Sequence, residues 1–546
     1  MLGKFSTLVD LLRERALLMP EKKAFIFLPD GETPSGGLTY AELEQRACAI
    51  AAQLQAQNAQ GERALLLYPP GLEFIEAFFG CLYAGAIAVP AYPPRRGSSL
   101  LRLESIVHDA QAHYILTTTS LLDNIQERFV QNPLLSSSLQ GLTTDNISSD
   151  KARDWQDPHI TPETVAFLQY TSGSTGMPKG AIVNHYNLLH NSALINQAFQ
   201  DRADSIGVSW LPSYHDMGLI GGILQPMYVG ASMLIMPPVT FLQRPLRWLQ
   251  AISNYRATSS GGPNFAYELC ISKATPEALA HLDLSSWQLA FSGAEPVRVE
   301  TLKRFSETFA PCGFQFDAFT PSYGMAETTL IVSSNRKKHP PRWTTVDGQA
   351  LAQNRIQETT EADMPILVSC GQPLGDLHIA IAHPETCEPC DPNDVGEIWV
   401  SGDSVVQGYW NRPKLTQEVF GAHLSTGEGP FLRTGDLGFL KDGELFVTGR
   451  RKDVIIIRGR NHYPQDIEKT VETSHPALRI AWGAAFAVEV DGEERLAIAQ
   501  EVERSALRKL KTEAQVTEVL QAIRTRVAQN HELQPFAILL LKTGSI

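Results

Sequence analysis

One short stretch of the sequence combines the residue types that bind phosphate groups. It runs from Tyr170 to Gly180, reads YTSGSTGMPKG and follows the apolar run 165–168. Closely spaced glycines let backbone N–H groups converge on an anion, the hydroxyls add donors, and Lys179 supplies a compact positive charge. Pro178 stands where a Walker A loop needs glycine before its lysine, so the stretch is not that motif. We therefore expect a loop that holds a polyphosphate; the alternative is a flexible Ser/Gly linker.

Three residues further along the chain could complete a site for a nucleotide and a metal ion. Glu327 offers carboxylate oxygen, the ligand that Mg²⁺ prefers. Asp436 can accept hydrogen bonds from both hydroxyls of a ribose, and Arg450 can donate to ribose or phosphate. Taken singly, these residues could equally be a solvated Glu, a turn Asp and a surface Arg. Their neighbours and their order along the chain favour a shared site.

In that order, the motifs resemble the signature of the superfamily of acyl-CoA synthetases, peptide-synthetase adenylation domains and luciferases. After the phosphate loop come SGAEP at 292–296, YGMAET at 323–328, TGD at 434–436 and GRRKD at 449–453. The resemblance implies that the chain binds ATP and Mg²⁺, with Glu327 as the metal ligand and Lys452 as a hinge. It assigns nucleotide binding to the following residues: Thr171, Ser172, Gly173, Ser174, Thr175, Gly176, Gly293, Ala294, Glu295, Tyr323, Gly324, Met325, Asp436 and Arg450.

The same resemblance implies a reaction. A carboxylate attacks the α-phosphorus of ATP, pyrophosphate leaves with Mg²⁺, and an acyl-adenylate remains. The carboxylate is already ionised at neutral pH and the leaving group is bound to metal, so no general base is required. Positioning and charge stabilisation then carry the step. We expect catalytic roles for four residues: Thr171, Lys179, His215 and Glu327.

The stretch WLPSYHDMGLIGG at 210–222 indicates which acid is activated. It is similar to the L-P-x-x-H-D-M-G-L run of the fatty acyl-AMP ligase branch, and residues 455–468 resemble that branch as well. The resemblance implies a fatty acid, held in a tunnel for which small residues leave room, although ordinary core packing is the alternative. An amino acid stays open as the substrate, because amino-acid adenylators place an Asp near this position. The expected acyl-binding residues are His215, Asp216, Gly218, Gly221 and Gly222.

The segment 335–363 bears on the acceptor of the acyl group. It is rich in charged and polar residues, and acyl-CoA synthetases are much shorter here. In fatty acyl-AMP ligases such an insertion is thought to keep the small domain away from the arrangement that receives CoA. The resemblance thus implies transfer to an acyl carrier protein, as in loading domains of polyketide or peptide synthases. The alternatives are an acyl-CoA synthetase with a surface loop here, and a non-catalytic nucleotide- or acyl-binding module.

The elements that must position these residues are predicted to be mixed α/β. Thr39 and Glu42 form a capping box before a helix expected over 40–56. An apolar strand at 63–68, a helical apolar face and a second strand at 86–89 then predict a βαβ unit. The same alternation continues to about residue 319. We therefore expect a largely parallel sheet with helices on its faces.

Two changes of pattern divide the chain. Short strands separated by turn residues predict a β-rich subdomain over about 371–449, and a small mobile α/β domain restarts at 450–546 with a helix over 464–472. We expect residues 1–449 to form the large adenylating domain. The family's P-K-T-x-S-G-K segment, whose final Lys reaches the active site, does not follow residue 541, so we expect the small domain to be truncated and adenylation to be slowed about a hundredfold.

The composition excludes several classes of partner. The chain has 546 residues, and 46 basic against 59 acidic residues give a net charge of −13, which argues against nucleic acid as the main partner. The most apolar stretch, 208–239, is interrupted by His215, Asp216, Gln225, prolines and glycines, so no membrane span is expected. Seven scattered cysteines suit a reduced, cytoplasmic protein. The lone C-x-x-C at Cys387 and Cys390 has no second pair, which favours a hairpin over a zinc or redox site.

Overall fold

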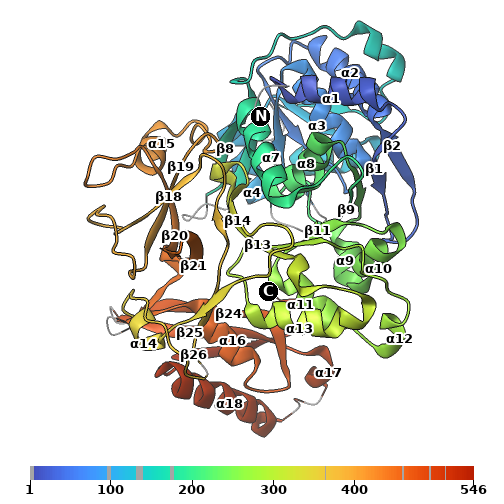
Figure 1. Cartoon of the computed structure of the whole chain (residues 1–546). Coiled ribbons are helices and arrows are strands. Elements are labelled where there is room, and N and C mark those ends of the chain that lie inside the picture. The colour runs from blue at the N-terminus through green and yellow to red at the C-terminus, as the bar shows by residue number, and fades with distance from the viewer. Residues whose placement is uncertain are drawn as a thin grey trace.

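The computed structural model describes residues 5–94, 100–130, 139–171, 177–362, 364–457, 460–490, 493–508, 510 and 512–545. Figure 1 shows the N-terminal elements at the top, the β-rich subdomain at the left and the C-terminal domain below. Two large sheets with their helices form the body. The predicted mixed α/β class, with a β-rich subdomain and a small C-terminal α/β unit, is confirmed.

The first sheet of the body carries the predicted phosphate loop. Five of its six strands run parallel, and only the last pair, β7 and β8, is antiparallel. The predicted βαβ unit is present, since β3 and β4 pair in parallel with α3 between them in the chain. In spatial order the strands are β6 (Gln140–Thr143), β5 (Tyr114–Thr117), β3 (Arg63–Leu66), β4 (Ile87–Pro90), β7 (Val165–Thr171) and β8 (Lys179–Asn184).

The second sheet has nine strands and a parallel centre. The neighbours β1, β10, β9, β11, β12 and β13 are parallel, and antiparallel strands close both edges. Central parallel strands are covered on both faces, and most residues of these strands are accordingly buried. The order is β17 (Gln372–Pro373), β14 (Ile331–Ser334), β13 (Phe319–Gly324), β12 (Leu289–Ser292), β11 (Ser259–Gly261), β9 (Ile206–Ser209), β10 (Ser232–Ile235), β1 (Lys23–Phe27) and β2 (Gly36–Thr39).

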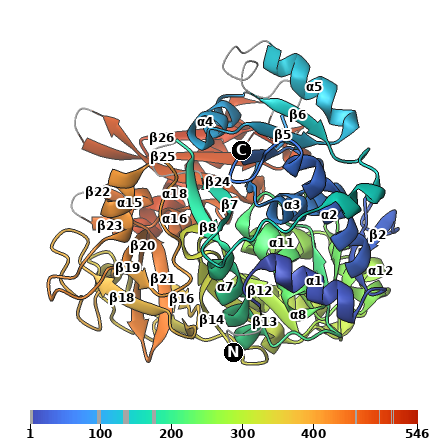
Figure 2. The same cartoon turned by 90° about the horizontal axis from the view of Figure 1, so that it is seen from above.

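Helices cover both sheets of the body (Figures 1 and 2). The predicted capping box is confirmed, because the side chains of Thr39 and Glu42 each accept from the other's backbone N–H at the start of α2. Gly85, with φ of 68°, ends α3 in the left-handed conformation that glycine adopts without strain. The helices are α1 (Leu8–Leu18), α2 (Tyr40–Gln55), α3 (Leu72–Ala84), α4 (Leu101–Ala110), α5 (Thr119–Val130), α7 (His185–Phe199), α8 (Gln225–Val229), α9 (Pro238–Gln243), α10 (Leu246–Tyr255), α11 (Asn264–Ile271), α12 (Pro276–Leu279) and α13 (Val299–Phe309).

The β-rich subdomain is a four-stranded antiparallel sheet with one helix, α15 (Pro413–Phe420). Asp442 and Gly443, both at positive φ, form the tight turn that joins its last two strands. Its sheet starts later than the predicted boundary near 371, because β17 pairs with β14 of the nine-stranded sheet. The strands are β18 (His378–Ala382), β19 (Gly396–Ser401), β20 (Leu432–Lys441) and β21 (Glu444–Arg450).

The polar segment 335–363 begins directly after β14. Its first strand, β15 (Trp343–Thr345), pairs antiparallel with β16 (Ile366–Val368), which follows the segment, and a short helix, α14 (Gly348–Leu351), lies between them in the chain. The segment therefore has secondary structure of its own rather than forming an irregular loop.

The C-terminal domain has its own hydrophobic cluster and its own sheet. The helix predicted over 464–472 is confirmed at those bounds. The hairpin β22 (Ile455–Ile457) and β23 (Arg460–His462) precedes α16 (Pro464–Glu472), β24 (Leu478–Val490), β25 (Glu493–Val502), α17 (Arg504–Leu507), α18 (Glu513–His531) and β26 (Ala537–Leu541). Within the described ranges, we find no helix whose length and hydropathy would allow it to cross a membrane. All seven cysteines lie within those ranges and are free thiols, and Cys387 and Cys390 lie in the turn-rich connection between β18 and β19.

Candidate active site

A cavity of about 1300 Å³ opens beside the carboxyl ends of the central parallel strands. Open α/β sheets bind their ligands at this edge. The final residues of three strands reach the cavity: Ser209 of β9, Ser292 of β12 and Gly324 of β13. Most of the predicted site residues meet here, although they come from distant parts of the chain. They are Thr171, Lys179, His215, Asp216, Gly221, Gly222, Gly293, Ala294, Tyr323, Gly324, Met325, Glu327, Arg450 and Lys452.

Other predicted residues are placed differently. Ser172, Gly173, Ser174, Thr175 and Gly176 lie outside the described residues. The structure does not place Gly218 along the cavity: a Cβ at this position would lie 2.0 Å from the carbonyl oxygen of Pro212, so glycine is needed for close backbone packing. Glu295 is exposed and does not line the cavity, whereas its neighbour Ala294 does and has the unusual φ of 69°.

Thr171 and Lys179 stand at the base of the predicted phosphate loop. They are partners in the antiparallel ladder, at the last residue of β7 and the first of β8. This pairing fixes both ends of the loop on one edge of the sheet. Lys179 is buried, and its Nζ lies 5.3 Å from the ring centroid of Tyr409, within range of a cation–π interaction.

Glu327 is buried beside the same tyrosine. The hydroxyl of Tyr409 donates to Oε1 of Glu327 over 2.8 Å. Burial raises the pKa of the Glu327 carboxyl, the negative charges of Asp216 and Asp436 raise it further, and the Tyr409 hydrogen bond opposes these effects. A bound cation would stabilise the ionised form. The ionised carboxylate is therefore destabilised by burial in the free protein and would be favoured when a metal ion binds.

Asp436 lies just behind the cavity wall. Its Oδ2 accepts from the hydroxyl of Tyr323 over 2.8 Å and its Oδ1 accepts from Nε of Arg450 over 2.9 Å. Asp436 and Arg450 face each other across the β20–β21 ladder, which is why residues 14 apart in sequence can pair. Asp436 does not itself line the cavity, although Thr434 and Gly435 do. The predicted ribose acceptor is thus held rigidly by two donors.

His215 and Asp216 form an ion pair at the start of a π-helix, η2 (Met217–Leu224). Nδ1 of His215 lies 2.6 Å from Oδ1 of Asp216, which also accepts from the backbone N–H of Met217 over 2.7 Å. The hydrogen bond with Asp216 raises the pKa of His215. A π-helix is rare and frequently marks a functional site. Here it turns the His–Asp pair toward the cavity.

An apolar arm of the cavity lies between the nine-stranded sheet and the helices α7, η2 and α8. Gly221 and Gly222 line this arm. A Cβ at Gly222 would lie only 3.0 Å from Oγ of Ser209, so a larger residue would narrow the arm. The apolar side chains that line it are Ile195, Phe199, Val208, Leu211, Met217, Val229, Met233, Phe291, Leu330 and Ile331.

Sequence reasoning missed several residues of the cavity wall, among them Tyr409 and Gln169. Tyr409 lies outside every motif, and its partner Glu327 is 82 positions away, so no local pattern could reveal the contact. Gln169 precedes the phosphate loop and lines the cavity. Its Nε2 donates to the carbonyl of Tyr214 over 3.1 Å, and among the described residues its buried Oε1 has no hydrogen-bond partner. A polar residue inside the apolar strand β7 was the available signal for Gln169.

The family model for AMP-binding enzymes matches residues 12–410. The chain belongs to this family. It is 50% identical over 551 residues, covering 100% of the chain and 92% of the relative, to the medium-chain-fatty-acid–[acyl-carrier-protein] ligase JamA of Moorena producens. It is 37% identical to a putative fatty-acid–CoA ligase, fadD21, of Mycobacterium leprae, with 99% and 95% coverage. Among solved structures, a fatty acyl-adenylate ligase from L. pneumophila in complex with acyl adenylate and pyrophosphate superimposes with a TM-score of 0.80, 41% identity and 100% and 94% coverage.

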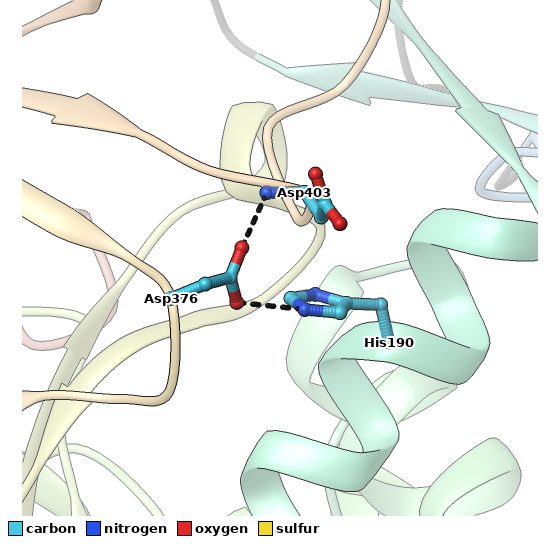
Figure 3. A group of neighbouring side chains, drawn as sticks. All are labelled: His190, Asp376 and Asp403. Atoms are coloured by element: carbon cyan, nitrogen blue, oxygen red, sulfur yellow. Dashed lines mark hydrogen bonds and ion pairs between the residues drawn. The ribbon is translucent and has the colours of Figure 1, made fainter. Parts of the chain in front are cut away.

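This member of the AMP-binding enzyme family also has a group of side chains of the metal-binding type away from the cavity (Figure 3). His190 of α7 is only 3% exposed, and both of its ring nitrogens are engaged. Nε2 lies 2.8 Å from Oδ1 of Asp376 and Nδ1 lies 2.8 Å from Oγ of Ser404. The backbone N–H of Asp403 donates to Oδ2 of Asp376 over 3.1 Å. The group therefore links α7 to the two loops that flank β18 and β19.

Proposed function

We propose that the protein activates a fatty acid with ATP, forming an acyl-adenylate and pyrophosphate, and transfers the acyl group to the phosphopantetheine thiol of an acyl carrier protein. The observation that carries this proposal is the continuity of one cavity. Its polar part contains Lys179, Glu327 and Arg450, and its other arm is lined by apolar side chains. A nucleotide and an apolar acid can therefore meet within a single enclosure.

The nucleotide occupies the polar part of this cavity. We assign the loop of residues 172–176 and Lys179 to the phosphates, and the strand ends at Gly293, Ala294 and Tyr323 to the base. A carboxylate has about four lone-pair positions, so Asp436 can bind ribose hydroxyls while it keeps Tyr323 and Arg450 as donors.

Glu327 is the proposed Mg²⁺ ligand. A buried carboxylate in the polar part of the cavity fits this ion, which usually binds one or two carboxylates together with substrate phosphates and water. The bound ion would neutralise charge on the departing pyrophosphate.

The chain's own residues position the reacting groups. A carboxylate oxygen of the acid forms a bond to the α-phosphorus while the bond to the pyrophosphate oxygen breaks. His215, whose pKa is raised by Asp216, offers positive charge where the apolar arm of the cavity, which is the proposed acyl arm, meets the polar part. Thr171 and Lys179 add a hydroxyl and an ammonium group at the loop. Preorganised donors of this kind stabilise charge that develops in the transition state.

The acceptor is proposed from the contacts of the insertion. The backbone N–H of Asn461 donates to the carbonyl of Ala352 over 3.1 Å, and its side-chain amide donates to Oδ1 of Asn354 over 2.8 Å. Val346 and Leu351 of the insertion share a buried cluster with Tyr463 of the C-terminal domain. The insertion thus braces the small domain just beyond Lys452, the proposed hinge. Such a brace favours a carrier protein over CoA, because it restrains the domain rotation that the family uses to receive CoA.

The deciding experiment measures pyrophosphate release with fatty acids and amino acids, each alone, with CoA, and with a phosphopantetheinylated carrier protein. We expect fatty acids to be the best substrates and acyl transfer to require the carrier protein. We further propose that this carrier belongs to a polyketide or peptide synthase and that the reaction takes place in the cytoplasm, where the free thiols stay reduced. Acyl-CoA formed as fast as acyl-AMP would identify the protein as an acyl-CoA synthetase instead.

A further inference from the structure

The acyl arm of the cavity runs along the whole length of the central strands. It is lined by Ser209 at the carboxyl end of β9 and by Ser205 just before its amino end. Ser232 and Ser259, the first residues of β10 and β11, line it as well. Four strand residues at about 3.3 Å each span roughly 13 Å. The arm therefore ends at the amino edge of the sheet, opposite the nucleotide.

An ion pair with little exposed side-chain surface lies at this end. Nζ of Lys337 lies 3.4 Å from Oδ1 of Asp201, and the hydroxyl of Ser259 donates to the same oxygen over 2.6 Å. The two side chains are only 8% and 11% exposed, respectively. Asp201 follows α7 and lines the acyl arm, whereas Lys337 belongs to the insertion that follows β14. The insertion is held here by a second contact, since the backbone N–H of Lys337 donates to the carbonyl of Ala198 over 3.2 Å.

A second cavity of about 790 Å³ lies on the other side of this ion pair. It shares Asp201 and Ser205 with the acyl arm, so the two spaces adjoin. Apolar side chains and the serines of the strand ends line the acyl arm, whereas the lining of the second cavity is polar and charged. The second cavity is lined by Asn196, Gln197, Gln200, Asp201, Arg202, Asp204, Ser205, Thr258, Gln288, Lys337 and Lys338.

We propose that the Asp201–Lys337 ion pair is the stop of the acyl tunnel and sets the longest fatty acid that the enzyme activates. The inference rests on the proposed function, because it concerns the substrate of that same site. An acyl chain that reached farther would have to separate the two charges without offering either of them a hydrogen bond. Separating a buried ion pair costs more than the burial of a few methylene groups returns. The insertion would thereby have a role in selecting the acid as well as the acceptor.

The test uses the double variant Asp201→Ala/Lys337→Ala of the full chain. Both partners are replaced, because a single substitution would leave an unpaired buried charge and destabilise the fold. Pyrophosphate release is measured with saturated acids from hexanoic to octadecanoic acid. We expect the wild type to lose activity sharply beyond one chain length. In the variant this limit moves to longer acids, and kcat/KM for the first excluded acids rises by about tenfold or more, relative to octanoic acid. An unchanged profile in a folded variant overturns the proposal.

A matched control separates the tunnel stop from a general loosening of the insertion. Arg342 of the insertion pairs with Glu444 of β21 over 3.0 Å, and neither residue lines either of the two cavities described above. We expect Arg342→Ala/Glu444→Ala to keep the wild-type limit. The charge-reversed variant Asp201→Lys/Lys337→Asp should restore the limit that the alanine pair lost. The proposal is overturned if the control variant shifts the limit as far as Asp201→Ala/Lys337→Ala does. It is also overturned if the charge-reversed variant accepts the longer acids as well as Asp201→Ala/Lys337→Ala does.

Equilibrium binding keeps this inference distinguishable from the proposed function. Binding of octanoic and hexadecanoic acid is measured by calorimetry with the wild type and with the Asp201→Ala/Lys337→Ala variant. Thermal unfolding of both proteins is measured alongside. Tighter binding of hexadecanoic acid by the alanine pair supports the tunnel stop even if no acid releases pyrophosphate, in which case only the proposed reaction fails. If both proteins release pyrophosphate with the same chain-length limit, the proposed reaction stands and the proposed tunnel stop is wrong.

Discussion

The hydroxyl of Tyr409 lies 2.8 Å from Oε1 of the buried Glu327 and donates a hydrogen bond to it. The ring of the same tyrosine lies beneath the ammonium group of Lys179. One aromatic side chain therefore touches both the proposed metal ligand and the proposed phosphate-binding cation. This arrangement links the β-rich subdomain, in which Tyr409 lies between β19 and α15, to the chemistry of the two large sheets.

Replacing Tyr409 by phenylalanine should weaken Mg²⁺ binding in a pH-dependent way. The hydrogen bond lowers the pKa of Glu327, so its loss leaves burial less opposed and raises that pKa further. The Mg²⁺ concentration for half-maximal adenylation should rise about tenfold, with the larger effect at acidic pH, where the carboxyl is more often protonated. Mg²⁺ titrations at two pH values check this. Tyr186→Phe, which removes a tyrosine–carboxylate hydrogen bond to Asp403 outside the cavity, should leave the titration unchanged.

Glu327→Gln should lower adenylation and raise the Mg²⁺ requirement while stabilising the free protein. Burial raises the pKa of Glu327, so its ionised form destabilises the fold above that pKa, and the penalty disappears as pH falls through it. The amide removes the penalty and can still accept from Tyr409. We expect the apparent Tm to rise by about 1–2 °C at neutral pH and by less in acid. A wild-type Mg²⁺ titration would show that Glu327 has only a structural role.

Asp436→Ala should weaken ATP binding by about 2 kcal/mol, or roughly thirtyfold. The substitution removes the proposed ribose acceptor and leaves Arg450 and the buried hydroxyl of Tyr323 without their shared partner. Calorimetric titration with ATP measures the loss. Asp283→Ala is the control, since Asp283 forms an exposed pair with Arg256. Equal ATP affinity in the two variants contradicts the ribose assignment.

The His215–Asp216 pair predicts a pH dependence of acid binding. A protonated His215 attracts the carboxylate of the acid, and Asp216 raises the pKa of that imidazole. The kcat/KM for the fatty acid should fall as pH rises through this raised pKa. In Asp216→Asn the fall should occur at lower pH, because the ion pair is lost and burial lowers the pKa of the histidine. His215→Gln should lack this limb of the pH profile. Profiles of identical shape in all three proteins contradict a charged role for His215.

Loosening the brace between the insertion and the C-terminal domain should admit CoA. Asn461→Ala combined with Leu351→Ala removes a hydrogen bond and a cluster contact between the two. The domain then rotates more readily. Acyl-CoA formation should rise about tenfold, because fewer molecules keep the domain in the braced arrangement. Acyl-CoA is measured in single-turnover reactions from preformed acyl-AMP. Arg342→Ala, which frees the insertion only from β21, is the control. No increase over that control contradicts the bracing role.

Local sequence patterns were sufficient for much of the fold. The Thr39–Glu42 capping box, the alternation that produces parallel strands and the helix at 464–472 all depend on neighbours within a few positions, where the periodicity of side chains is decisive. The same holds for the strands that flank the predicted phosphate loop, since β7 and β8 pair immediately on either side of it.

Contacts between distant segments decided the rest of the site. The sequence alone determined which residue types were present and in what order, including Glu327 and Asp436. Only the tertiary structure placed Tyr409 on Glu327, enclosed Asp436 between Tyr323 and Arg450, turned Gly218 away from the acyl arm, and brought Lys337 to Asp201. The reason is physical: these partners are brought together by strand order and helix packing, which bury distant side chains in one enclosure, and no local periodicity encodes which of them will meet.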